Sequence, residues 1–260
     1  DWNGGMSDPN FIGFGNYARL LKDIATGGIF LKSIGNTWIM WILNVIPQFI
    51  LALALAVLLT SREFKGKDFF RAVFYLPNLI TMASVGALFL FLLEYPGGTI
   101  NNLLISITGG EPYNFLQDIW VSRIAISSIL TWMWFGYTMI IFMAGIQAIP
   151  DEYYEAATVD GASKWKLFTK ITLPLLKPIM LYQVVTSIIG GLSMYDLPQV
   201  LTQGRGGPLN STMTMVMQIY RHAFGNDNFG YASAVAIGLF IHIFIVVFIA
   251  IKFIRPHEVD

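Results

Sequence analysis

Few side chains in this sequence are grouped in a way that supports covalent chemistry or metal binding. The three histidines are His222, His242 and His257. Their wide separation offers no set of metal ligands. The absence of cysteine excludes a thiol nucleophile and a disulfide framework. Gly66-Lys67 is followed by Asp68 and lacks the upstream glycine of a phosphate-binding loop, so we expect no ATP hydrolysis by this chain.

Polar and aromatic side chains within otherwise apolar segments could bind a polar solute instead. Such groups are costly in a membrane unless they face a cavity or another helix. Two interpretations stay open: the groups line a solute path, or they bond to their own helix carbonyls and pack at interfaces. The candidate path residues are Asn44, Gln48, Trp132, Tyr137, Tyr182, Ser187, Tyr195 and Asp196.

The elements that must position these groups are apolar. Hydrophobic residues make up 55% of the 260-residue chain and charged residues 12%, about half the usual share near 25%. Lysine plus arginine and aspartate plus glutamate number 16 each, so no net charge favours nucleic acid. This composition excludes a disordered chain and most cytosolic enzymes.

Long uncharged segments predict membrane-spanning helices. The uncharged segments cover residues 33–61, 72–93, 124–150, 178–195 and 228–251. A bilayer core of about 30 Å needs roughly 20 apolar residues in helical form, which each segment reaches or approaches. Their apolar runs do not alternate, which disfavours a β-barrel. The sequence therefore predicts an all-α integral membrane protein with five spanning helices in this chain.

The basic residues predict the orientation of these helices. Ten of the sixteen cluster on one side: Arg62, Lys65, Lys67, Arg71, Lys164, Lys166, Lys170, Lys177, Lys252 and Arg255. By the positive-inside rule this side is cytoplasmic, which places the N-terminus outside. We therefore expect residues 1–32 to form an external segment and residues 33–260 a transmembrane domain. An odd number of helices with an external start suggests that an earlier spanning helix is missing.

One long cytoplasmic segment, residues 150–178, contains turn signals that predict an elbow. Asp151 is a suitable N-cap for a short helix that ends near Val159. Gly161 can adopt a positive φ, and Ser163 can cap a second short helix. We call residues 150–178 the elbow segment.

The elbow segment allows two interpretations. The small side chains of Ala156, Ala157 and Ala162 would let its tip enter a cleft on another protein. Alternatively, the second helix lies on the lipid surface with Trp165 and Phe168 inserted.

Two further features also leave alternatives open. Gly190-Gly191 permits either close helix packing, which we favour, or a break in the helix. Asp196 is either a hydrogen-bonding group at the external rim, which we favour, or a cap for the next segment.

The elbow segment resembles the EAA signature of permease subunits of ATP-binding-cassette importers. The matching residues are Glu155-Ala156-Ala157, Asp160-Gly161-Ala162 and the later Leu173-Pro174. The resemblance implies that this segment is a coupling helix that docks into a nucleotide-binding subunit, and that Glu155, Ala156, Ala157, Asp160, Gly161 and Ala162 make that contact.

Two more stretches resemble sugar-type members of the same family. They are Tyr195-Asp196-Leu197-Pro198 with Leu201-Thr202, Gly206-Gly207-Pro208 and Ser211-Thr212, and the N-terminal Phe11-Ile12-Gly13-Phe14-Gly15-Asn16-Tyr17. The resemblance covers nearly the whole chain. It implies a helical bundle of the MetI-like type and identifies the missing element as the first family helix.

The resemblance also implies a function and a set of partners. We expect a non-catalytic, multi-pass subunit of a prokaryotic inner membrane that passes a sugar to the cytoplasm by alternating access. The implied partners are ATPase subunits that bind ATP and Mg²⁺, a second permease subunit in a heterodimer, an extracytoplasmic binding protein and the lipid bilayer. No cofactor or metal is expected in this chain. The alternatives are a permease of the same architecture for another solute and a secondary carrier; an intramembrane enzyme lacks a catalytic constellation.

Overall fold

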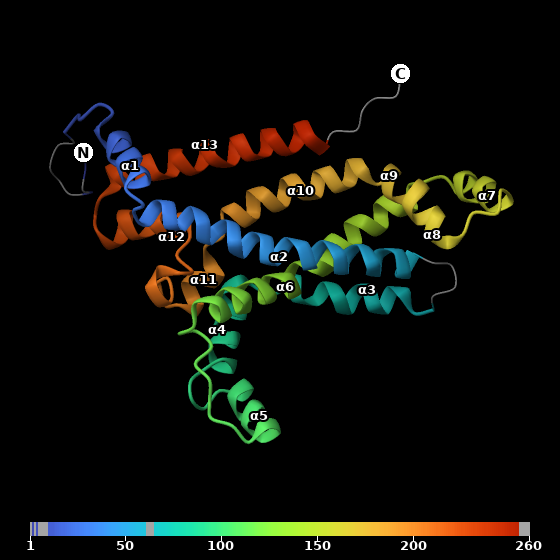
Figure 1. Cartoon of the computed structure of the whole chain (residues 1–260), viewed down its shortest axis with the longest axis horizontal. Helices are drawn as coiled ribbons and strands as arrows, with labels where there is room; N and C mark the ends of the chain where they lie inside the picture. Colours follow the sequence, from blue (N-terminus) through green and yellow to red (C-terminus); the bar gives the residue numbers. More distant parts are fainter. Residues whose placement is uncertain (1, 3, 5–9, 61–64, 255–260) are drawn as a thin grey trace. The chain divides into compact units, whose positions relative to one another are not determined.

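All regular structure in the described residues is helical, as the sequence predicts (Figure 1). The computed structural model describes residues 2, 4, 10–60 and 65–254, so Arg62, Arg255 and His257 lie outside the described residues. The helices in chain order are α1 (Gly15–Ala25), α2 (Ile29–Thr60), α3 (Lys67–Tyr75), η1 (Leu76–Leu79), α4 (Met82–Leu92), α5 (Thr99–Thr108), α6 (Ile119–Gln147), α7 (Asp151–Val159), α8 (Lys164–Leu167), η2 (Phe168–Thr172), α9 (Leu173–Leu175), α10 (Lys177–Leu192), α11 (Asp196–Leu201), η3 (Pro208–Asn210), α12 (Met215–Tyr220), η4 (Arg221–Gly225) and α13 (Phe229–Ile254).

Four segments of the described chain are long and apolar enough to cross a bilayer. They are α2, α6, the segment Lys177–Leu201 and α13. A fifth span exists if the bent pair Lys67–Leu79 and Met82–Leu92 counts as one. The bend falls within an uncharged segment because Thr81 has extended backbone angles and caps α4, accepting a hydrogen bond of 3.2 Å from the Ser84 N–H.

Three α-helices outside the spans, α1, α5 and α12, were not predicted. α1 lies in the expected external segment, and α5 follows the turn after α4. All three are short and carry polar residues, so they leave no long uncharged segment in the sequence. α2 also begins at Ile29, before the expected boundary at residue 33, because Lys32 is tolerated in its first turn.

The chain divides into two compact units. The first contains Asp1–Leu43, Ile80–Ile129 and Ile189–Ile245. The second contains Asn44–Leu79, Leu130–Ile188 and Val246–Asp260. Each unit therefore takes part of α2, α6, α10 and α13.

In the first unit, a polar clamp holds the loop after α11 against α2 and α6. Arg123 donates to the Asn36 Oδ1 atom at 2.7 Å and to the Ser211 carbonyl oxygen at 2.9 Å. The Asn36 amide donates to the carbonyl oxygens of Asn210 and Met213 at 2.7 and 3.1 Å. These bonds satisfy backbone carbonyls at and after η3, which would otherwise be costly in a membrane.

The second unit has a core of small and flexible apolar side chains. The buried cluster consists of Ala52, Ala56, Leu59, Met139, Phe142, Met143, Ile146 and Leu176, from α2, α6 and the loop before α10. The alanines of α2 and Gly145 of α6 allow close approach; a Cβ atom at Gly145 would lie 2.6 Å from a Leu176 methyl carbon. This packing supports the base of the elbow segment.

Candidate functional site

The elbow segment begins with α7, directly after Pro150. Pro150 occupies the N-cap position, and Asp151 is the first helical residue, so the prediction that Asp151 is the N-cap is wrong. Pro150 has the non-helical backbone angles of an N-cap, so α7 starts at the next residue. No side chain accepts a capping hydrogen bond at this end of α7. The carboxylates of Asp151 and Glu152 lie in the first turn, where the helix dipole favours negative charge.

Gly161 ends α7 in the conformation that the sequence predicts. Its φ is +75°. The Gly161 N–H donates to the Thr158 carbonyl at 3.0 Å, and the Ala162 N–H donates to the Ala157 carbonyl at 2.9 Å. These two bonds form a Schellman motif, in which the left-handed residue is usually glycine. The motif fixes the direction in which the chain leaves the helix.

Ser163 caps the second helix, also as predicted. Its hydroxyl oxygen accepts a hydrogen bond from the Lys166 N–H at 3.4 Å. The chain then passes through the π-helical turn η2 and α9 into α10. Within this return path, the Tyr154 hydroxyl shares a hydrogen bond of 3.0 Å with the hydroxyl of the buried Thr172. This bond joins α7 to the turn that leads into the α10 span.

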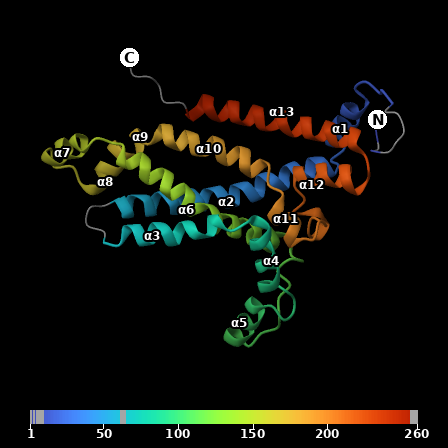
Figure 2. The same cartoon turned by 180° about the vertical axis from the view of Figure 1, so that it is seen from behind.

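The outer surface of the elbow segment combines small and exposed side chains. Of the motif residues, Glu155, Ala156, Asp160 and Gly161 are exposed, and Ala157 and Ala162 are half-buried. Val159 is 88% exposed and Trp165 is 72% exposed. Figures 1 and 2 show α7 and α8 together at one end of the second unit, beyond α9. The tip thus presents apolar groups and little bulk.

Two candidate path residues of α2 are bonded to α6 in the second unit. The Gln48 amide donates to the Thr138 hydroxyl at 2.8 Å, and Asn44 accepts from the Thr131 hydroxyl at 3.1 Å. Both Asn44 and Gln48 are buried, at 8% and 6% exposure. They link two helices through hydrogen bonds, so each is at least partly structural.

Two aromatic candidates, Tyr137 of α6 and Tyr182 of α10, are in contact in the second unit. Tyr137 and Tyr182 share a side-chain hydrogen bond. Tyr182 is 51% exposed and Trp132 39% exposed. By contrast, Ser187 donates to the Val184 carbonyl at 2.8 Å, as in the interpretation that hydroxyls bond to their own helix.

Two candidates lie in the first unit, at the start of α11. The Tyr195 ring stacks on Tyr220 with centroids 4.2 Å apart. Asp196 is the first residue of α11 and is exposed, so its carboxylate stands where the helix dipole favours it.

The two glycines near the end of α10, Gly190 and Gly191, have different surroundings. A Cβ atom at Gly191 would collide with the Trp41 indole ring, whereas one at Gly190 would have no neighbour within 4 Å. The helix continues through both residues to Leu192. Close packing therefore explains Gly191.

Sequence reasoning missed the residues that hold these elements in place. Tyr154 and Thr172 gave no signal because a bond between two hydroxyls 18 residues apart has no sequence pattern. Arg123 could have been found from the sequence, because it is a charged residue directly before the uncharged segment 124–150. Across the ranges that the structure describes, no group of three or more histidine or acidic residues could hold a metal ion.

Comparisons with known proteins agree with this arrangement. Residues 30–257 match the family described as binding-protein-dependent transport system inner membrane component. The chain is 36% identical to the lactose transport system permease protein LacF of Rhizobium radiobacter, over 87% of this chain and 75% of that protein. It is 32% identical to the multiple sugar-binding transport system permease protein MsmF of Streptococcus mutans, over 100% of this chain and 86% of that protein.

A solved structure has the same fold. A chain from a bacterial alginate ABC transporter, in complex with an alginate pentasaccharide-bound periplasmic protein, superposes with a TM-score of 0.81 at 26% identity. The match covers 94% of this chain and 83% of that one.

Proposed function

Because the chain belongs to the family of binding-protein-dependent transport system inner membrane components, we propose that it carries a sugar or oligosaccharide across the membrane as one permease subunit of an ATP-driven importer. The relatives named for lactose and multiple sugars, and the alginate transporter with its periplasmic protein, support a carbohydrate substrate. The solute would arrive from an extracytoplasmic binding protein.

The elbow segment is the observation that carries the coupling part of the proposal. A rigid, glycine-terminated helix with an exposed tip suits docking into a cleft of an ATPase subunit. Its exposed Val159 and small alanines would be buried there, which would favour association through apolar contact. ATP and Mg²⁺ would bind to that partner, and the chain itself supplies only the moving part.

Alternating access follows from this arrangement. When two ATPase subunits close around ATP, the docked α7 would move, and the Tyr154–Thr172 bond would pass the displacement into α10. The path residues on α6 and α10 would then change their exposure to either side. A second permease subunit would provide the facing half of the path, and we propose a heterodimer.

Substitutions in the elbow segment test the coupling role. Proline at Gly161 would require φ near −65° and remove the N–H that bonds to Thr158, so we expect Gly161→Pro to abolish sugar uptake in proteoliposomes containing the assembled transporter. Gly161→Asn is the control, because asparagine tolerates a positive φ and the space beside Gly161 is open. ATP hydrolysis should persist in both variants.

Glu155→Lys reverses one exposed charge of the motif and should also separate hydrolysis from uptake. Glu152→Lys is the matched control on the same helix, outside the motif. Unchanged uptake in both Gly161→Pro and Glu155→Lys would refute the coupling role. Uptake against a gradient by vesicles holding this polypeptide alone would instead favour a secondary carrier.

A further inference from the structure

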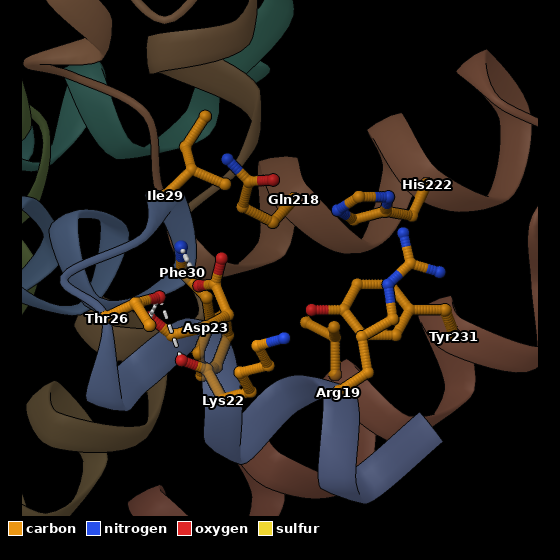
Figure 3. Close-up of a pocket in the computed structure, with 10 residues that line it drawn as sticks. Arg19, Lys22, Asp23, Thr26, Ile29, Phe30, Gln218, His222 and Tyr231 are labelled. Carbon is orange, nitrogen blue, oxygen red and sulfur yellow. Dashed lines mark hydrogen bonds between the residues drawn. The ribbon is translucent and has the colours of Figure 1, made fainter. Parts of the chain in front are cut away.

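A polar pocket of about 400 Å³ lies in the first unit, and its lining contains none of the candidate path residues. Figure 3 shows its walls: side chains of α1, of the start of α2, of α12 with η4, and of the first turns of α13. The polar lining includes Arg19, Lys22, Asp23, Gln218, His222 and Tyr231, and Thr26, whose hydroxyl donates to the Lys22 carbonyl at 2.9 Å. The Lys22 ammonium and the Tyr231 hydroxyl point toward each other across the space.

One polar group of the lining, Gln218, is buried, and its amide nitrogen lies on the side of Ile29 (Figure 3). Gln218 is 1% exposed, and its amide nitrogen has no hydrogen-bond partner among the described residues. A buried donor left without an acceptor typically costs about 1–3 kcal/mol. A ligand that brings an acceptor oxygen to Gln218 would remove this cost.

The charges at the mouth of the pocket are positive. Arg19 lies with its guanidinium carbon 4.3 Å from the centre of the Tyr231 ring. Neither Arg19 nor Lys22 forms an ion pair with a residue that the structure describes. Both side chains are exposed and could reach a ligand without desolvation of a buried charge.

The one lining carboxylate is already engaged. Asp23 Oδ2 accepts a hydrogen bond of 2.8 Å from the Phe30 N–H, and its Oδ1 atom lies against Gly28, where no Cβ atom would fit. Asp23 therefore offsets the positive end of the α2 dipole. The remaining groups leave the pocket with an excess of donors and of positive charge.

The pocket lies at the ends of two spanning helices. Ile29 and Phe30 start α2, and Tyr231 lies in the first turn of α13. Both helices exceed the roughly 20 residues that cross a bilayer, so these turns reach the level of the lipid headgroups. Further along α13, the exposed rings of Phe240 and Phe244 form an apolar face that acyl chains could cover.

We propose that this pocket binds a phosphate group. The oxygens of a phosphate point in different directions from one tetrahedral centre and so suit donors on several elements, whereas the two oxygens of a carboxylate lie in one plane. The phosphate belongs either to a phospholipid headgroup at the membrane surface or to a free phosphate ion. The volume is sufficient for a phosphodiester with its glycerol.

Thermal unfolding of the assembled, detergent-purified transporter tests the proposal. The added probes are phosphatidylglycerol, diacylglycerol as a lipid without phosphate, and inorganic phosphate. We expect phosphatidylglycerol to raise the melting temperature and diacylglycerol not to. An equal rise with inorganic phosphate identifies a free ion as the ligand, and a rise with phosphatidylglycerol alone identifies a lipid. No rise with either phosphate compound overturns the proposal.

Variants show whether the effect arises in this pocket. The double variant Arg19→Gln/Lys22→Gln should lose the rise in melting temperature. Lys32→Gln, which removes a nearby exposed charge outside the pocket, should keep it. An equal rise in the double variant and the wild type overturns the proposal.

Gln218→Leu separates a ligand-binding role from a structural one. Leucine removes the unpaired amide, so without phosphate this variant should be at least as stable as the wild type. With phosphate it should gain less. A loss of stability together with an unchanged response to phosphate contradicts the assigned role of Gln218.

Discussion

Arg123 and Asn36 are joined by a hydrogen bond of 2.7 Å that connects α6 to α2. Asn36 is 5% exposed, so its Oδ1 atom depends on the guanidinium group for a partner. The same guanidinium also holds the carbonyl of Ser211. One side chain thus joins two helices and a loop in the first unit.

Removal of the Arg123 side chain should destabilise the protein. Arg123→Leu leaves the Asn36 oxygen and the Ser211 carbonyl without this donor, and we expect a loss of about 2 kcal/mol or more. Arg123→Lys keeps the charge but not the fork of donors, so it should recover only part of the loss. Thermal unfolding in detergent measures both. An Arg123→Leu variant as stable as the wild type would contradict the clamp.

The two adjacent glycines of α10 should respond differently to the same substitution. Gly191→Ala places a methyl group against the Trp41 ring and should lower the melting temperature, because a packed helix contact must open. Gly190→Ala meets no neighbour and should be neutral or stabilising, because alanine favours the helix by about 1 kcal/mol. Equal effects in the two variants would show that close packing is not the reason for Gly191.

The bond between Tyr154 and Thr172 should affect coupling more than folding. Tyr154→Phe removes one hydrogen bond, worth about 1 kcal/mol, so the amount of sugar carried per ATP hydrolysed should fall severalfold at most. Tyr153→Phe is the matched control, since Tyr153 is a neighbouring exposed tyrosine of α7. If the bond carries the effect, adding Thr172→Val to Tyr154→Phe should cause little further loss.

Substitutions of Trp132, Tyr137 and Tyr182 should alter transport without preventing assembly of the transporter. We expect Trp132→Ala and Tyr137→Ala to raise the KM for sugar uptake while co-purification with partner subunits stays normal, because lost ring faces and hydroxyls weaken solute binding. Tyr137→Phe and Tyr182→Phe each remove the same hydrogen bond. If that bond is purely structural, the two variants should change the KM equally. Normal kinetics in all four variants would assign these residues to packing.

His222 should make stability depend on pH. Burial, and then the positive charges of Arg19 and Arg221, hold its pKa below the ordinary value of 6.5, although Asp23 opposes them. The unfolded chain therefore takes up a proton at a pH where the folded chain does not, and stability falls as the pH drops through about 6.5 toward the folded pKa. The melting temperature of His222→Gln should fall less than that of the wild type between about pH 7 and pH 5.

The sequence was sufficient to predict the features that depend on composition or on local turn chemistry. Uncharged segments located the spanning helices, and Gly161 and Ser163 predicted the two turns of the elbow segment. The bend between η1 and α4 near Thr81 was missed. The spans were located from the spacing of charged residues, and a helix cap within an uncharged segment does not change that spacing. The Asp151 prediction failed because Pro150 already supplied the extended residue before α7.

The long-range contacts could not be predicted in the same way. A hydrogen bond between Gln48 and Thr138, or between Arg123 and Asn36, depends on how two distant helices face each other. A single sequence does not show how two distant helices are oriented toward each other. The roles of the candidate path residues also remain predictions, because their hydrogen bonds are compatible with helix packing as well as with solute binding.

The exposed tip of α7 has a practical consequence. Val159 is 88% exposed and the chain contains no cysteine, so Val159→Cys would create a single thiol in these 260 residues. A fluorophore or spin label attached there would report on one position of this chain, with no background from its other residues. The same variant would permit thiol cross-linking to a neighbouring subunit while nucleotide is added and removed.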